Sequence, residues 1–432
     1  MILLIHTRAA IQQIHRQLGR PEYSYRFVVS EFRPLLDELG VVIEVKDPES
    51  EIDAIYASCR RHNVPCVFLS FMPPNKTPIG LACPTVCVFA WEYENLPNEA
   101  FGGKPRNDWR RVLARLGSAV THSSFTVKSV HAVLGANFTI VSAPAPLWDR
   151  MQTVHGPHTT PATLPILRGV AIDSRRTQLA DYRHSLLEAA LPEALPLPAN
   201  RHQHQTEIPL DGVLYTAVFN PYDGRKNCML MIGAFCDALR DKPDATLLLK
   251  LTHHDPSKLI PDMLEIIYRA GDIACRVLLV HAYLEGADYH TLLRATTYAV
   301  NTSHGEGQCL PLMEYMSAGK PAIAPRHTSM LDYVDEHCAF VVDSSAEIGT
   351  WPHDQRQAFR TLRQRIHYQS LVMAYRRSYH VAREEPDVYA SMSKAATESL
   401  RRYCSMETVR PRLQGLLAQV LDKHDLPAED HG

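Results

Sequence analysis

The stretch HGEGQCLPLMEYMSAGKP, residues 304–321, decides how the second half of this chain is interpreted. It follows TYAVNTS (297–303), a short apolar run that is typical of a buried strand. HGEGQCL has the composition of a loop, and PLMEYMSA that of a helix with Pro311 at its first position and Gly319 just past its end. Free N–H groups at the start of such a helix, together with the helix dipole, attract anions. The stretch therefore predicts an anion-binding loop at the carboxyl edge of a sheet.

Two glutamates lie in this stretch, Glu306 in the predicted loop and Glu314 in the predicted helix. On a helix, Leu312 and Met316 share one face, whereas Glu314 lies roughly 160° from each of them. We therefore expect Glu314 to face away from the core and toward a cleft. Each carboxylate has an ordinary alternative: a solvated surface glutamate for Glu314, and a loop or capping carboxylate for Glu306.

A second turn of the same kind carries two cations. FNPYDGRKN (219–227) follows a predicted strand and opens a helix, so Arg225 and Lys226 lie at another carboxyl edge of the same sheet. Cations at a helix start oppose the helix dipole, which indicates that an anionic group compensates them. A fork-shaped guanidinium and a point-charge ammonium together suit a diphosphate. The alternative is a charged helix start that is exposed to water.

Length and composition bound the class of protein. A chain of 432 residues is too long for one hydrophobic core, and a net charge of −2 gives no basic field, so nucleic acid is not an expected partner. The ten cysteines include no CxxC pair, which favours buried reduced thiols over structural zinc. The apolar start MILLI is too short for a signal peptide, and no apolar run is long enough to span a bilayer. We expect a cytoplasmic protein.

Short apolar runs alternate with amphipathic segments in both halves of the chain, which predicts two α/β domains with parallel sheets. The expected division is a first domain at 1–150, an extended Pro/His-rich connection with one helix at 151–210, a second domain at 211–385, and a helical segment at 386–432 that returns toward the first domain. Residues 355–425 are expected to be mostly helical. The predicted strands are 1–5, 41–45, 64–70, 85–90, 118–124 and 138–143 in the first domain, and 213–219, 245–251, 275–282, 297–303, 321–325 and 339–343 in the second. Ligands of such sheets bind beyond the carboxyl ends of the strands.

The spacing Glu306-x7-Glu314, inside E-G-x-x-L-P-L-x-E-x-M-x-x-G-x-P, resembles the signature of retaining GT-B glycosyltransferases of the large group-1, family-four type. The resemblance covers the second domain well, and the first domain is similar mainly in its pattern. It implies two Rossmann-like doubly wound domains that face each other across a cleft, with C-terminal helices closing the pair. It also implies a nucleotide-diphosphate sugar on the second domain and a saccharide or lipid-linked acceptor on the first.

The resemblance assigns roles to the four charged residues. Glu314 would bind the ribose hydroxyls, and Glu306 would contact a hydroxyl of the donor sugar. Arg225 and Lys226 would hold the diphosphate, so that no metal and no cofactor is implied. Catalysis, as in a hexosyltransferase, would come from positioning and electrostatics, with the leaving diphosphate taking the acceptor proton. Further donor contacts would come from Gly307, Gln308, Cys309 and Leu310, and the base would lie near His281 and Tyr283.

The chain also departs from the family pattern. The family usually has Phe-Gly where this chain has Gln308-Cys309, so the side chain of Cys309 would narrow the sugar pocket or alter the choice of donor. The basic residues are often separated in the family, whereas Arg225 and Lys226 are adjacent, so one of them would point elsewhere.

In the first domain, VFAWEYENLPNEAFGG (88–103) follows a predicted strand at the edge that faces the cleft. Aromatic faces beside carboxylates suit sugar rings and their hydroxyls. We expect Glu92 to bind the acceptor or to act as a base toward its hydroxyl, with Trp91 or Tyr93 as a platform. The alternative is a structural turn with Trp91 in the core. His122, after the next strand, is a further acceptor-binding candidate.

A basic amphipathic segment at 104–116 suggests peripheral contact with the cytoplasmic side of a membrane, and an ordinary solvated helix face is the alternative. Two other functions remain open: a GT-B-shaped nucleotide-sugar isomerase, which would turn over without acceptor, and a non-catalytic sugar-nucleotide-binding partner protein. The family suggests polysaccharide or glycoconjugate biosynthesis. The base, the sugar and the acceptor depend on single hydrogen bonds that the sequence does not reveal.

Overall fold

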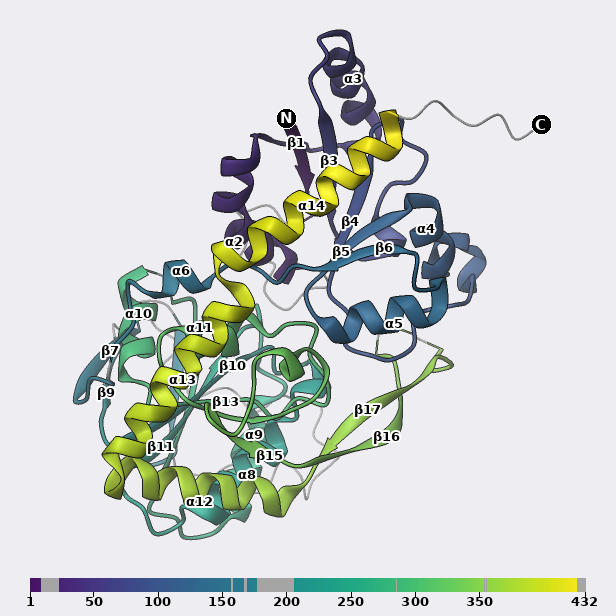
Figure 1. The fold of residues 1–432 in the computed structure, drawn as a ribbon. Helices are drawn as coiled ribbons and strands as arrows, with labels where there is room; N and C mark the ends of the chain where they lie inside the picture. Colours follow the sequence, from purple (N-terminus) through teal and green to yellow (C-terminus); the bar gives the residue numbers. More distant parts are fainter. Residues whose placement is uncertain are drawn as a thin grey trace.

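Two sheets form the two halves of the molecule (Figure 1). The computed structural model describes residues 1–8, 23–156, 158–166, 169–176, 206–284, 286–352, 354 and 356–425. Each strand predicted for the two domains is present, and two of them, at 213–219 and 245–251, have the predicted bounds to the residue. The prediction of two doubly wound α/β domains with C-terminal helices is confirmed.

The N-terminal sheet is parallel throughout, in the order β2-β1-β3-β4-β5-β6. Its central strands β3 and β4 are buried along their whole length, because helices cover both faces. The helix α2 buries its apolar residues at helical spacing against this sheet. The elements are β1 (Ile2–His6), α2 (Ser24–Leu39), β2 (Val41–Glu44), α3 (Pro48–Arg61), β3 (Cys66–Phe71), η2 (Pro74–Lys76), β4 (Thr85–Phe89), η3 (Phe101–Gly103), η4 (Pro105–Asn107), α4 (Trp109–Leu116), β5 (Ser118–Thr121), α5 (Ser124–Leu134) and β6 (Thr139–Ser142).

The C-terminal sheet has the order β15-β14-β13-β10-β11-β12-β8, with β8 antiparallel to its neighbour and the other pairs parallel. The switch between β13 and β10 brings the loops that follow these two strands side by side, which is where an open α/β sheet binds its ligand. The elements are β10 (Val213–Phe219), η6 (Gly224–Lys226), α8 (Cys228–Ala238), β11 (Ala245–Leu251), α9 (Ile260–Arg269), β12 (Arg276–Ala282), α10 (Gly286–Ala295), β13 (Tyr298–Val300), α11 (Leu310–Ser317), β14 (Ala322–Pro325), η7 (Thr328–Asp332) and β15 (Ala339–Val342).

The described part of 151–210 differs from the expected extended connection. After α6 (Trp148–Met151), β8 (Gly169–Asp173) joins the C-terminal sheet, and β7 (Ala162–Ile166) pairs with β9 (Thr206–Leu210). Apolar residues of β7 and β9 pack against the same core as β10, β11 and β12. Long-range pairing of this kind leaves no local signature beyond alternation, which is why the sequence did not reveal it. The predicted helix of this region falls mostly outside the described residues.

A hairpin was also missed. Residues 355–425 are mostly helical, as predicted. Before these helices, β16 (Ser344–Thr350) and β17 (Arg360–Ile366) form an antiparallel pair that was not predicted and that reaches the N-terminal domain (Figure 1). Near its tip, the ring of Trp351 lies 5.5 Å from the ring of Trp91 and 5.9 Å from the ring of Trp109, centroid to centroid. The hairpin of the C-terminal domain therefore packs against the N-terminal domain.

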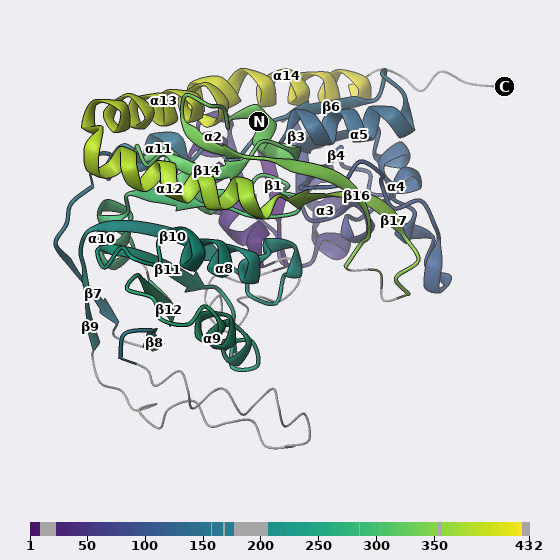
Figure 2. The same ribbon diagram turned by 90° about the horizontal axis from the view of Figure 1, so that it is seen from below.

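Three helices end the described chain: α12 (Tyr368–Glu384), α13 (Pro386–Cys404) and α14 (Met406–Asp425). Figure 2 shows α13 and α14 running along one side of both domains. The helix α13 packs on α11, whereas α14 buries Val409, Leu413 and Leu417 in the N-terminal core. Within the described ranges, no helix combines the length and apolarity needed for a membrane span.

Candidate active site

The glycine loop and its helix lie as the sequence predicts. β13 ends at Val300, residues 301–309 form the loop, and α11 begins at Leu310 with Pro311 in its first turn. Cys309 adopts a left-handed conformation with φ of 64°, which turns the chain sharply into the helix. Gly319 follows the helix with φ of 82°, a conformation that suits glycine.

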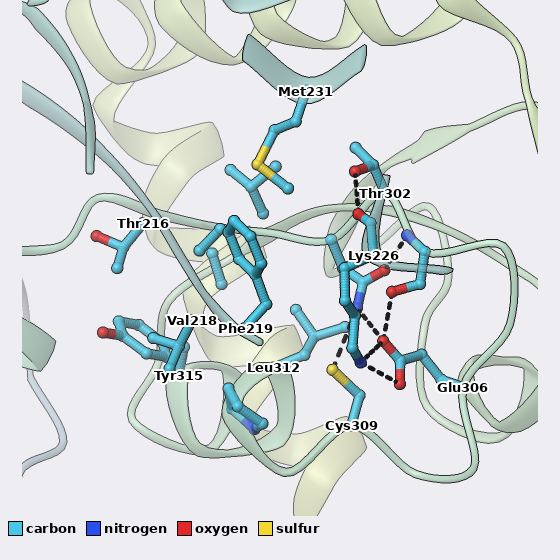
Figure 3. Close-up of a pocket in the computed structure, with 16 residues that line it drawn as sticks. Thr216, Val218, Phe219, Lys226, Met231, Thr302, Glu306, Cys309, Leu312 and Tyr315 are labelled. Carbon is cyan, nitrogen blue, oxygen red and sulfur yellow. Dashed lines mark hydrogen bonds and ion pairs between the residues drawn. The ribbon is translucent and has the colours of Figure 1, made fainter. Parts of the chain in front are cut away.

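Glu306 is buried and binds Lys226. The Lys226 Nζ donates to both carboxylate oxygens, at 2.6 and 2.8 Å, and the Asn301 Nδ2 and Ser303 hydroxyl donate to the same carboxylate (Figure 3). Burial alone would raise the pKa of Glu306, but the charges of Lys226 and Arg225 lower it to about 2. A cavity of about 20 Å³, room for roughly one water molecule, adjoins the pair.

Arg225 lies beside Lys226 and also points at Glu306. Its guanidinium donates to Asp223 at 2.8 Å and to the carbonyl of Gly305 at 2.8 Å, and lies 3.7 Å from a Glu306 oxygen. Both cations thus converge on one carboxylate, and the expectation that one of them would point elsewhere is wrong. The turn η6 and the left-handed Asn227 after it bring both side chains to this edge.

The loop of the N-terminal domain that follows β4 lies directly on the glycine loop. Glu92 Oε1 is 3.3 Å from the Arg225 Nη1, which is an ion pair between the domains. A Cβ at Gly305 would lie 3.0 Å from the Glu92 carbonyl oxygen, and a Cβ at Gly307 would lie 2.8 Å from the Cβ of Ala90. Both glycines are needed because a second backbone approaches them closely. The structure therefore brings Glu92 of the N-terminal domain to Arg225 of the C-terminal domain.

The aromatic neighbours of Glu92 are not exposed. Trp91 and Tyr93 are 2% and 3% exposed and pack with Trp109 and Trp351. The prediction of a sugar platform is therefore wrong for these two rings, and the alternative, a structural turn with Trp91 in the core, is correct. The sequence did not reveal this burial because the residue that covers Trp91, Trp351, lies on the hairpin of the other domain.

His122 is also enclosed. Its ring is 0% exposed, lies beside Phe32, and its Nδ1 is 3.0 Å from the carbonyl oxygen of Ala143. Burial lowers the pKa of His122 to about 4, so the ring is neutral at pH 7. An acceptor contact through His122 contradicts this burial, and we correct the prediction accordingly.

The side chain of Glu314 points away from the core that α11 packs on, as expected, but its carboxylate is bound by other side chains. It accepts hydrogen bonds from Arg150, at 3.0 Å, and from the Tyr289 hydroxyl, and its side chain is 16% exposed. Burial raises the pKa of Glu314, and Arg150 and Tyr289 oppose that rise. Arg150, which also binds Glu31, was missed because nothing in its sequence context places it beside the motif.

The other residues predicted to contact the donor lie around the carboxyl edge of the C-terminal sheet. His281 Nε2 is 2.7 Å from the carbonyl oxygen of His253, and Tyr283 is half-buried just past β12. Gln308 Oε1 accepts from the N–H of Ala145, 3.0 Å away in the other domain. Cys309 Sγ accepts from Asn301 at 3.1 Å, and burial raises the pKa of this thiol to about 12. Leu310 packs against both the N-terminal core and the core around α11.

Comparison with known proteins shows what this architecture is similar to. No protein-family model matches the sequence, and no curated protein shows significant similarity to it. Among solved structures, HepE of Anabaena in complex with UDP and glucose is 13% identical, with a TM-score of 0.51, over 97% of this chain and 100% of that one. A glycosyltransferase from Rickettsia africae is 11% identical, with a TM-score of 0.55, over 97% and 98% of the two chains. Sucrose-phosphate synthase of Thermosynechococcus elongatus is 14% identical, with a TM-score of 0.53, over 98% and 99%. At this identity the likeness concerns the fold, and it shows that this chain has the GT-B fold.

Proposed function

We propose that this protein is a glycosyltransferase that moves a sugar from a nucleoside-diphosphate donor to a saccharide or lipid-linked acceptor, with retention of configuration. One observation carries the proposal. Arg225, Lys226 and Glu306 converge at the carboxyl edge of one domain, directly opposite Glu92 of the other. Two cations just before the start of α8, facing a carboxylate across a domain boundary, suit a diphosphate on one side and a hydroxyl on the other.

The proposed chemistry follows from the charges of the site. Arg225 and Lys226 would hold the diphosphate and stabilise the negative charge that grows on it as the bond to the sugar breaks. The acceptor oxygen would form its bond to the same face of the sugar carbon, and its proton would pass to a diphosphate oxygen. In this proposal the two cations neutralise the diphosphate without a metal. Glu92 would accept a hydrogen bond from the acceptor hydroxyl and orient it, and the bound donor would replace one of the carboxylates that now surround Arg225.

The donor assignments continue from the resemblance. Glu314 would bind the ribose hydroxyls in place of one of its present partners, Arg150 or Tyr289. Support for a nucleotide sugar also comes from HepE, whose structures hold UDP, UDP with glucose, and UDP-glucose. The base would lie near His281 and Tyr283, and the backbone from Gly307 to Leu310 would contact sugar and phosphate.

We further propose a cytoplasmic location, supported by the ten cysteines, all of which are free thiols. Contact with a membrane would involve the arginines around α4. Arg110 and Arg111 now pair with Asp108, and Arg111 is the more exposed of the two. A role in polysaccharide or glycoconjugate biosynthesis is the corresponding proposal for the pathway.

Thermal unfolding with UDP, GDP, ADP or CMP tests the proposal. A nucleotide at about a hundred times its dissociation constant adds roughly 2.7 kcal/mol to the free energy of unfolding. We expect one nucleoside diphosphate to raise the melting temperature of the wild type and to leave Glu314→Ala unchanged. Equal stabilisation of that variant would refute the role of Glu314, and no stabilisation of the wild type by any nucleotide would refute the donor site. Turnover of a nucleotide sugar without acceptor would instead support the isomerase.

A further inference from the structure

Lys250 is a cation inside a buried strand. It is the penultimate residue of β11, paired in register with Val218 of β10 and Val280 of β12. Only 5% of its surface is exposed. Leu248, on the same face of β11, packs with Leu292 of α10, so Lys250 extends along the sheet face that α10 covers.

The ammonium of Lys250 has no partner in the described part of the chain, neither an ion pair within 4.0 Å nor a hydrogen bond. Two other lysines, the partly buried Lys226 and the buried Lys320, each have hydrogen-bond partners for the ammonium. Lys226 binds both oxygens of Glu306, and Lys320 donates to the carbonyl oxygens of Gly156 and Arg294. A charged side chain that is nearly buried and has no protein partner is costly, so its retention indicates a partner that the free protein does not supply.

The position of Lys250 indicates what that partner is. Glu314, the carboxylate proposed for the ribose, is the charged group that acts on it most strongly, although the two are more than 4.0 Å apart. Tyr289 of α10 donates to Glu314, and it packs against the same core as Val218, the neighbour of Lys250 in the sheet. On the other side, β12 ends at Ala282, immediately before Tyr283, where the base is proposed to lie. Lys250 thus lies between the proposed ribose and base positions.

We propose that Lys250 is a nucleotide-binding residue, whose ammonium donates a hydrogen bond to an oxygen of the nucleoside half of a nucleoside diphosphate. This inference rests on the proposed function. Burial lowers the pKa of Lys250 to about 8, and Glu314 opposes that effect, so the side chain is still mostly charged at pH 7. Because burial already removes much of the water around this side chain in the free protein, a ligand oxygen that accepts from the ammonium forms a strong, charge-assisted hydrogen bond.

Calorimetric titration with UDP, GDP and ADP tests the proposal, using the wild type, Lys250→Met and Lys320→Met. For the nucleotide that the wild type binds, Lys250→Met is expected to lose about ten- to a hundredfold in affinity. Without nucleotide, this variant should melt at or above the wild-type temperature, because an apolar chain replaces an unpaired charge. The control Lys320→Met should melt lower, because two carbonyl groups lose their donor, and should keep the wild-type affinity.

Unchanged affinity of Lys250→Met, with the wild type binding normally, overturns this inference and leaves the proposed function standing. Failure of the wild type to bind any of the three nucleotides overturns both. If Lys250→Met does not fold, Lys250→Gln decides in the same way, since it keeps a neutral donor of similar length. A loss of affinity in Lys250→Gln supports the role of the charge, and wild-type affinity overturns it.

Discussion

Replacing Glu306 by Gln removes the buried carboxylate on which Lys226 and Arg225 converge, with almost no change of shape. The pKa of Glu306 is about 2 in the folded protein, against 4.5 for an unperturbed glutamate. Since one pKa unit corresponds to about 1.36 kcal/mol, the ionised carboxylate adds about 3 kcal/mol to the free energy of unfolding at pH 7. This conversion applies because the residue is 3% exposed, so that solvent screens it little. We expect Glu306→Gln to be less stable than the wild type by about that amount.

The pH dependence gives the sharper test. A carboxylate with a lowered pKa stabilises the fold at pH values above its unfolded pKa, and this contribution is lost as the pH falls from about 4.5 to about 2. Glutamine mimics the protonated carboxyl, so the difference between wild type and variant should shrink to about 1.5 kcal/mol at pH 3. Urea unfolding at pH 7, 5 and 3, followed by far-UV circular dichroism, measures it. Titration of other groups cancels in the difference.

Glu347→Gln is the matched control for this experiment. Glu347 pairs with Arg363 at 2.8 Å on the hairpin, but the two side chains are 30% and 45% exposed, and an ion pair that solvent screens in this way contributes at most about 1 kcal/mol. The loss of stability in Glu347→Gln should therefore be at most about 1 kcal/mol. If Glu306→Gln were as stable as the wild type at pH 7, or if its deficit were equal at pH 7 and pH 3, the argument for a buried ionised pair would be wrong.

Three further substitutions, one of them with a matched control, test the contacts that hold the two domains together. Gly307→Ala places a Cβ 2.8 Å from the Cβ of Ala90, so we expect this variant to melt at a lower temperature than the wild type. Its control is Gly415→Ala on α14, where the added Cβ meets open space, and this substitution should raise the free energy of unfolding by up to about 1 kcal/mol. Trp351→Ala should lower the free energy of unfolding in urea by about 3–5 kcal/mol and expose Trp91 and Trp109 to fluorescence quenchers. Unaltered quenching would show that the hairpin does not cover these two rings. Gln308→Leu leaves a buried backbone N–H of the other domain without its acceptor and should cost about 1–3 kcal/mol, and a neutral effect would show that the bond is not needed.

Much of the fold follows from local patterns in the sequence. The apolar runs of the two domains correspond to strands, because a strand buried on both faces needs a continuous apolar segment. The loop that contains Glu306 and the turn that contains Arg225 and Lys226 were also placed correctly, since glycine, proline and helix-start signals act within a few residues. The hairpin at 344–366 was missed, because its polar strands pair with each other on the surface and carry no core pattern.

The sequence by itself therefore determined the two sheets, the glycine loop and the cations at their carboxyl edges. Only the tertiary structure decided what each of these groups meets: Glu92 opposite Arg225, Trp91 beneath Trp351, and Lys250 without a partner among the described residues. The physical reason is the range of the interactions. Backbone propensity and hydrophobic period are fixed by neighbours in the chain, whereas burial and Coulomb energy depend on distances between residues that the sequence places far apart.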